Sequence, residues 1–189
     1  MTPPVRALGQ EYVAPPFRSR AGSPESIPYR IVGAVDGTTL SYEPAVAGAP
    51  ATLAQGQSVT FESTIAFRVT SQDEDHPFYI AQVMPGYSCI GDEDFVNLLP
   101  PAQWLSRYVF YTDYSYPTTN LVVVRMDNGA GFQDVSIDCL GAISGWQPIG
   151  NTNYQITNVD LVRDGAPNGA CANGPQTAES QAPFGLMVW

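Results

Sequence analysis

The chain has 189 residues and a mass of 20.4 kDa, enough for one large domain or two small ones with a buried core. Its formal net charge is −10, and all 8 basic residues are Arg, scattered along the chain, so it lacks the basic footprint that binds nucleic acid or an anionic membrane. The absence of Lys excludes Schiff-base, P-loop and Lys isopeptide chemistry, and the single His excludes a multi-His zinc site.

Gly and Pro occur 17 times each, which argues against a helical bundle because both residues break helices. Charged residues make up only 14% of the chain while hydrophobic residues make up 44%, so the chain has enough apolar material to form a core.

The first half of the chain reads as an extended arm followed by short strands. Residues 1–27 contain five Pro and few consecutive apolar residues, as in an arm lying on the body or extending from it. Tyr29–Val35 is predicted as a strand, Asp36-Gly37 as a two-residue turn and Thr38–Tyr42 as the returning strand of a hairpin. Further strands are predicted at Ser58–Glu62, Ala66–Thr70 and Phe78–Met84.

The second half repeats this pattern after a connecting segment at residues 86–106. Glu93–Leu99, which precedes two Pro residues, is the one candidate for a short helix. Asp127-Asn128-Gly129 is predicted as a turn. Strands are predicted at Tyr108–Tyr111, Leu121–Arg125, Asp134–Asp138, Tyr154–Thr157, Val159–Val162 and Gly185–Trp189.

These elements predict an all-β protein of sandwich type, with two similar antiparallel β-units at residues 28–85 and 107–189. The segments Val69–Val83 and Thr177–Trp189 each contain Ser-Gln, then Pro-Phe, then an apolar strand, which indicates an internal duplication. The alternative is that similar turn chemistry recurs in any β protein.

Several segments together resemble the IgGFc-binding protein N-terminal domain family, from about residue 29 onward. The most specific part is the succession of a Pro-Pro-Ala-Gln segment, an Asp-Cys strand and a closing Ser-Gln-Ala-Pro-Phe-Gly strand. The segments are YRIVGAVDGTTLSY (29–42), GDEDFVNLLPPAQWLSRYVFYT (91–112), TNLVVVR (119–125), VSIDCLG (135–141) and CANGPQTAESQAPFGLMVW (171–189).

The resemblance implies an extracellular all-β module, linked by name to immunoglobulin Fc binding and in bacteria to adhesion. It implies no catalytic residue and no cofactor. Because the family's domain is usually longer, the chain resembles its C-terminal portion.

The two ends of the chain lead us to expect a piece of a longer exported protein. The start lacks the apolar stretch of a signal peptide, and the chain stops on the apolar run Phe184–Trp189. The alternative is a native cytosolic chain. No apolar run is long enough for a membrane span, so we expect no membrane insertion.

The three cysteines predict one disulfide if the protein is secreted. Cys139 follows a predicted strand and Cys171 lies in a Gly-rich loop before the last one, so we expect these two to pair, with Cys89 left over. Alternatives are an intermolecular bond, three reduced cysteines in a cytosolic protein, or a thioester between Cys89 and Gln82 or Gln103.

The acidic clusters offer weak metal or catalytic signals. Residues 73–75 and 92–94 are all acidic but lack the spacing and central Gly of an EF-hand loop, so we expect solvated loop acids and no metal site. His76 stands near no nucleophile motif. We therefore expect no enzyme activity.

Tyrosines gather around the strand that begins the second unit. Tyr108 and Phe110 are expected on one face and Val109 and Tyr111 on the other, and further tyrosines follow in a turn. Exposed Tyr suits a protein or glycan contact, whereas the alternative is core and loop packing. The candidate binding residues are Tyr108, Tyr111, Tyr114 and Tyr116.

We therefore expect a non-catalytic binding or adhesion module, extracellular or on the cell surface, that recognises a protein or glycan ligand. The alternatives are a structural spacer within a larger secreted protein and an extracellular hydrolase.

Overall fold

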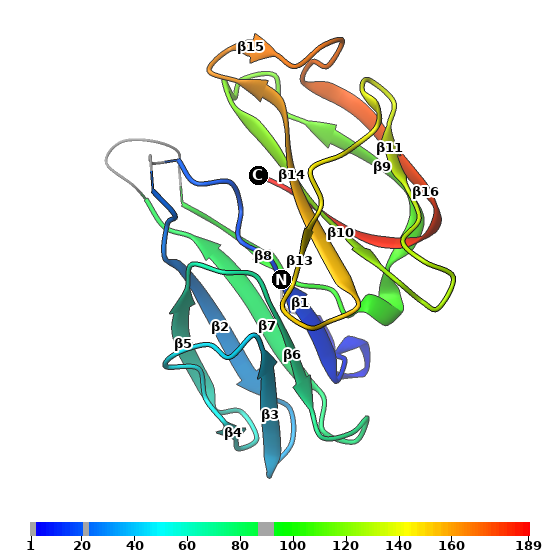
Figure 1. Cartoon of the computed structure of the whole chain (residues 1–189). Helices are drawn as coiled ribbons and strands as arrows, with labels where there is room; N and C mark the ends of the chain where they lie inside the picture. Colours follow the sequence, from blue (N-terminus) through cyan, green and yellow to red (C-terminus); the bar gives the residue numbers. More distant parts are fainter. Residues whose placement is uncertain (1–2, 21–22, 87–92) are drawn as a thin grey trace. The chain divides into compact units, whose positions relative to one another are not determined.

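The computed structural model describes residues 3–20, 23–86 and 93–189 (Figure 1). The chain divides into two compact units, Met1–Gln103 and Trp104–Trp189, so the division falls within the expected connecting segment.

The first unit contains eight strands and two short 3-10 turns among its described residues. Their bounds are η1 Val5–Ala7, β1 Glu11–Ala14, β2 Ile27–Gly33, β3 Thr38–Glu43, β4 Thr52–Leu53, β5 Ser58–Ser63, β6 Phe67–Ser71, β7 Phe78–Met84, β8 Asp94–Asn97 and η2 Pro101–Gln103.

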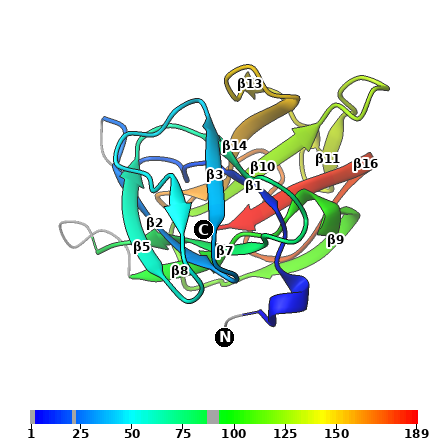
Figure 2. The same cartoon turned by 90° about the horizontal axis from the view of Figure 1, so that it is seen from below.

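The strands of the first unit form two antiparallel four-stranded sheets, with the orders β1-β6-β3-β4 and β5-β2-β7-β8 (Figure 1, and from below in Figure 2). Alternate residues of β2 are buried, as expected for strands that place one face on a core. The core is aromatic: Tyr29 packs against Phe61 and Phe67 with ring centroids 5.8 and 5.0 Å apart, respectively. The predicted all-β sandwich is therefore confirmed.

The predicted hairpin is wrong. Its two strands exist as β2 and β3, but β2 pairs with β5 and β7 while β3 pairs with β4 and β6. Each strand has one buried face. Placing them in different sheets lets both faces meet across one core, whereas a hairpin would put both on the same side.

The predicted short helix at Glu93–Leu99 is also wrong, because Asp94–Asn97 forms strand β8. Pairing with β7 gives this segment backbone partners that a single helical turn could not supply. Within the expected arm, the structure places β1, which pairs with β6 through Tyr12 and Val69.

The second unit consists of strands alone among its described residues. Their bounds are β9 Leu105–Thr112, β10 Thr119–Met126, β11 Val135–Ile137, β12 Gly141–Ala142, β13 Gln147–Pro148, β14 Tyr154–Arg163, β15 Ala166–Pro167 and β16 Gly174–Val188. The predicted strands at residues 154–157 and 159–162 are one continuous strand, β14, and the predicted final strand begins much earlier, at Gly174.

Strand β16 organises the second unit. The strand order is β12-β11-β16-β10-β14-β13, with β9 also on β16 and β15 on β14. The first half of β16 pairs with β9 and β11, and its second half pairs with β10 and, at Phe184, with Leu105 of β9. The register with β9 shifts between Glu179 and Phe184, where the pairing with β11 ends and the pairing with β10 begins.

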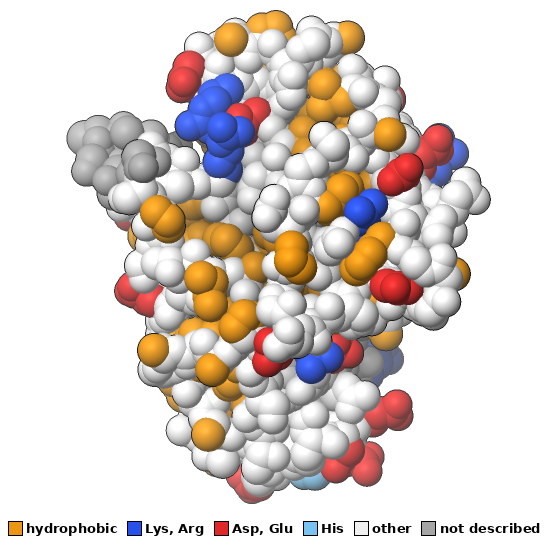
Figure 3. Space-filling model, in the orientation of Figure 1, with side chains coloured by type: hydrophobic (Ala, Val, Ile, Leu, Met, Phe, Trp, Pro, Cys, Tyr) orange, Lys and Arg blue, Asp and Glu red, His pale blue; other side chains and the backbone are white. Residues whose placement is uncertain are grey.

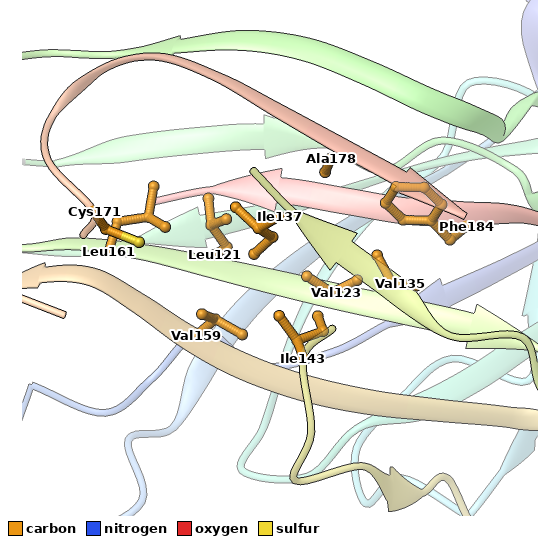
Figure 4. Close-up of a cluster of buried hydrophobic side chains, with 10 residues drawn as sticks. All are labelled: Leu121, Val123, Val135, Ile137, Ile143, Val159, Leu161, Cys171, Ala178 and Phe184. Atoms are coloured by element: carbon orange, nitrogen blue, oxygen red, sulfur yellow. The ribbon is translucent and has the colours of Figure 1, made fainter. Parts of the chain in front are cut away.

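The core of the second unit is mainly aliphatic (Figure 4). Leu121 and Val123 from β10 face Ile137 from β11 and Phe184 from β16, and all four are fully buried. Cys171 also belongs to this core and forms a disulfide with Cys139.

The two units repeat one pattern of strand pairing. In the first unit β6 lies between β1 and β3, and in the second the first half of β16 lies between β9 and β11. In the first unit β2 lies between β5 and β7, and in the second β10 lies between β14 and the second half of β16. The matching elements follow the same chain order, so β16 alone takes the places of β6 and β7.

The strand-pairing register agrees with the sequence match between residues 69–83 and residues 177–189. Ser71 pairs with Leu40 and Ser180 pairs with Val135, while Phe78 and Phe184 each pair with the last part of the neighbouring strand, β2 or β10. The shared Ser-Gln and Pro-Phe dipeptides therefore occupy equivalent positions, which supports an internal duplication.

Candidate functional site

The predicted tyrosines lie on or just after β9, an edge strand of the second unit. β9 pairs with β16 and with no other strand in the described part of the chain. Residues 105, 107, 109 and 111 point to one face because strand side chains alternate. All four are exposed, so β9 presents one solvent face and one unpaired edge.

That solvent face is mostly apolar. Leu105, Val109 and Tyr111 are between 56% and 74% exposed, and Tyr114 continues the row because its ring meets Tyr111 edge-on at 5.8 Å. Tyr116 is also exposed. We call Leu105, Val109, Tyr111, Tyr114 and Tyr116 the β9 surface.

Two hydrogen bonds stabilise the turn that carries Tyr114. The Asp113 carboxylate accepts bonds from the backbone N–H and the hydroxyl of Ser115, each at 2.8 Å. These bonds hold the pKa of Asp113 below its usual value. These bonds favour the observed conformation of the turn.

Gly174 allows the Tyr114 ring to lie close to β16. It has a φ of +127°, and a Cβ added there would lie 2.4 Å from the Tyr114 hydroxyl oxygen. Asn173 donates a hydrogen bond to the Tyr116 carbonyl at 2.8 Å, which anchors the far end of the same turn.

Tyr108 differs from the other three predicted tyrosines. Its side chain is half-buried. Its hydroxyl donates a hydrogen bond to the Phe184 carbonyl at 2.7 Å and accepts one from the Leu105 N–H at 2.9 Å. Its ring meets the Phe184 ring at 5.0 Å. These contacts engage Tyr108 within its own unit, so we do not include it in the β9 surface.

Sequence reasoning missed Leu105 and Val109. The alternation of Tyr108 and Val109 was predicted, but an apolar strand residue is normally assigned to a core. Only the position of β9 at a sheet edge, with one face uncovered, identifies these residues as surface. The pattern offered no signal for that.

The predicted pairing of Cys139 with Cys171 is confirmed, with an S–S distance of 2.04 Å and a sequence separation of 32. Cys89, expected as the leftover thiol, lies outside the described residues. Its suggested thioester partners lie in different settings: Gln82 is fully buried, whereas the exposed Gln103 donates a hydrogen bond to the Ala7 carbonyl.

The acidic loop around His76 is a self-contained turn. The Asp73 carboxylate contacts the His76 Nδ1 at 2.6 Å and accepts the Asp75 N–H at 3.0 Å. The bond to His76 is the main cause of the lowered pKa of Asp73. Within the described ranges, no three His, Cys, Asp or Glu side chains gather as a metal site would require.

Charged side chains are dispersed on the face drawn in Figure 3, with hydrophobic and uncharged polar groups between them. No helix in the described part of the chain is long and apolar enough to cross a membrane.

Sequence comparison assigns the chain to a family. The family described as IgGFc binding protein matches residues 1–189, the whole chain. The chain belongs to this family. The match also covers the first 28 residues, on which the resemblance above did not depend. No curated protein and no solved structure matches the chain.

Membership indicates an extracellular protein-binding module, since the domains of the IgGFc-binding family are of that kind. The disulfide fits this setting, because such bonds persist in oxidising compartments. The β9 surface presents exposed tyrosine and aliphatic side chains, and aromatic residues are enriched at protein interfaces.

Proposed function

We propose that this IgGFc-binding domain is a non-catalytic adhesion module, secreted or on the cell surface, that binds a partner protein through the β9 surface. The observation that carries the proposal is the row of exposed apolar and aromatic side chains on an edge strand. Isolated exposed apolar residues are ordinary, but a contiguous row is a mark of an interaction site.

The composition of the surface favours a protein ligand. Tyr supplies large, rigid contact area with a polar tip, and Leu105 and Val109 add apolar area that a glycan would not cover well. Arg107 lies within the row, between Leu105 and Val109, and its cross-strand neighbour is Glu179, so the surface also carries one charge of each sign. A protein partner can supply both apolar and charged groups to meet this surface.

The support beneath the surface favours a preformed site. Ala178 on β16 pairs with Tyr108, and the disulfide holds the segment leading into β16. A partner would therefore not have to order a flexible loop, which lowers the entropic cost of binding.

The test is a binding array with immobilised immunoglobulin Fc, immunoglobulin Fab and mucin-type glycans, read with the wild-type chain and with Val109→Asp and Tyr111→Ser variants. Ile65→Ser is the matched control, because Ile65 is an exposed apolar residue of the first unit. We expect a protein on the array to bind the wild type and the control, with at least tenfold weaker binding by both β9 variants.

Binding that the β9 variants leave unchanged would place the site elsewhere. Binding to glycans alone would contradict the protein ligand. A chain that binds nothing on the array would favour the spacer function, since a spacer needs no ligand.

A further inference from the structure

A groove of about 640 Å³ lies on the first unit, on the outer face of the β5-β2-β7-β8 sheet. Its volume is in the range of sites that bind small ligands or peptide side chains. All the residues that line it belong to the first unit, so it is separate from the β9 surface.

The floor and walls of the groove are apolar. Val32, Ala81 and Val83 form the floor from β2 and β7, while Tyr79 and Phe95 supply two aromatic rings. Phe95 is 52% exposed although it is a large apolar side chain on an edge strand. The groove therefore offers an aromatic-lined, open apolar surface.

Opposite charges stand at the two ends of this surface. Arg30 on β2 is exposed, and its charge acts on Tyr79, where it opposes the rise in pKa that burial causes. Glu93 and Asp94 are exposed at the start of β8. Arg30 pairs with Ala81, and Asp94 pairs with Met84, three residues further along β7. The backbones of Arg30 and Asp94 are therefore separated by two strand spacings across the sheet and three residues along it, which is about 14 Å.

Because the two units repeat one pattern of strand pairing, the outer face of the β5-β2-β7-β8 sheet can be compared with its equivalent in the second unit, and the two faces differ. Tyr79 and Arg30 of the first unit correspond in register to Gly185 and Val122 of the second. In the second unit the Trp104 indole lies over Gly185, where an added Cβ would be 2.9 Å from the ring, and Val122 is fully buried. In the first unit this face carries the groove, which Pro3 and Leu8 of the N-terminal segment also line, and Arg30 places a cation there.

We propose that the groove on β2, β7 and β8 binds an extended peptide segment of a partner protein, with a large apolar or aromatic side chain between an acidic residue and a basic residue. The acidic residue meets Arg30, the apolar side chain packs between Tyr79 and Phe95, and the basic residue meets Glu93 and Asp94.

Charge complementarity selects a peptide over an acidic glycan. A glycan can supply carboxylates for Arg30 but rarely a cation, and Glu93 and Asp94 would repel additional anionic groups. A peptide supplies both signs. An extended chain covers about 3.3 to 3.6 Å per residue, so charges four residues apart span the 14 Å between the two ends of the groove.

The probe that follows is the blocked peptide Asp-Ser-Trp-Ser-Lys, titrated into the full chain by calorimetry. Its controls are the reversed charge order, Lys-Ser-Trp-Ser-Asp, and the peptide with Ala in place of Trp. We expect at least tenfold weaker binding of the Ala peptide and at least threefold weaker binding of the reversed peptide.

Variants of the groove test the site itself. Ala81→Trp fills the floor and is expected to abolish binding, while Arg30→Glu is expected to reverse the preference between the two charged peptides. Ile65→Ser is exposed and outside the groove, so it should leave binding unchanged. Melting temperature checks that each variant folds, and Phe95→Ser replaces Ala81→Trp if that variant does not.

Three results would overturn the proposal: no binding of the Trp peptide, equal affinity for both charge orders, or binding that survives Ala81→Trp or Phe95→Ser. Binding of a sialylated trisaccharide that depends on Arg30, with no peptide binding, would assign the groove to acidic glycans instead. Loss of the β9 surface does not affect any of these outcomes, so this proposal and the proposed function can fail separately.

Discussion

Tyr108 contacts Phe184 in the same way that Tyr12 contacts Phe78. In both pairs the tyrosine hydroxyl donates to the phenylalanine carbonyl, at 2.7 and 2.8 Å, and the ring centroids are 5.0 Å apart. Each hydroxyl also accepts the N–H of the residue three positions before it, at 2.9 Å. We call this arrangement the tyrosine bridge; in each unit it joins the first strand to the Phe of the shared Pro-Phe dipeptide, at the start of β7 or in the second half of β16.

Removing either hydroxyl should destabilise its unit. Tyr12→Phe or Tyr108→Phe leaves a buried or half-buried carbonyl and N–H without partners, at a cost of about 1 to 3 kcal/mol. Thermal unfolding followed by calorimetry measures this, with Tyr111→Phe as the control because its hydroxyl is exposed. The structural role assigned to Tyr108 would be contradicted if its variant were as stable as that control.

Alkaline pH should destabilise the first unit through Tyr12. Burial raises the pKa of Tyr12 from 10.0 to about 12. A raised pKa means that the folded state holds the proton more tightly, so this contribution to stability is complete below pH 10 and is lost as the pH rises through 12. Burial also raises the pKa of Tyr29.

Denaturant unfolding at pH values from 8 to 12 measures this effect. The wild type should lose stability above pH 10 more steeply than Tyr12→Phe does. Parallel curves for the two proteins would show that Tyr12 is not responsible.

Removing the disulfide should destabilise the second unit. Cys139 and Cys171 are 32 positions apart, and the chain-entropy estimate for such a loop is about 3 to 4 kcal/mol. The test is the double variant Cys139→Ser, Cys171→Ala. Ser is chosen for position 139 because that site is partly buried, and Ala for position 171 because that site is buried and apolar. The unfolding free energy of this variant should fall by that amount without reductant, and reductant should then have no further effect on the second unit.

Replacing Gln82 by Leu should stabilise the first unit. Gln82 is fully buried, and both polar atoms of its amide lack hydrogen-bond partners within the described part of the chain. Its cross-strand neighbour Tyr29 has a buried hydroxyl in the same condition. Removing an unsatisfied buried amide should raise the unfolding free energy by about 1 to 3 kcal/mol.

The matched control is Gln176→Leu, because Gln176 is also buried but its amide donates to the Ala172 carbonyl at 2.7 Å. That variant should lose stability. If both Leu variants shifted stability in the same direction, hydrogen bonding would not be the cause.

Replacing Gly174 by Ala should disturb the β9 surface. The φ of +127° disfavours any side chain, and the new methyl group would displace the Tyr114 ring. We expect lower stability and a changed tyrosine environment in near-ultraviolet circular dichroism. Gly129→Ala is the control, since Gly129 also has a positive φ but open space around it, so it reports backbone strain without the ring displacement.

The sequence by itself determined the β class and the positions of most long strands, and it favoured the Cys139–Cys171 pairing that the structure confirms. Alternating apolar residues between Gly and Pro turns report strands directly, because strand side chains alternate between two faces. It also indicated the repeat, and the structure places the Ser-Gln and Pro-Phe dipeptides of the two units at matching positions in the pairing register.

Only the tertiary structure decided which strands pair and which faces remain uncovered. The Asp36-Gly37 turn indicated a hairpin, yet β2 and β3 lie in different sheets because both apolar faces can then be buried in one core. Tyr108 and Tyr111 are equally aromatic in the sequence, but one bonds to Phe184 and the other faces solvent. Exposure depends on long-range pairing and on what packs over each strand, and local sequence patterns carry no record of either.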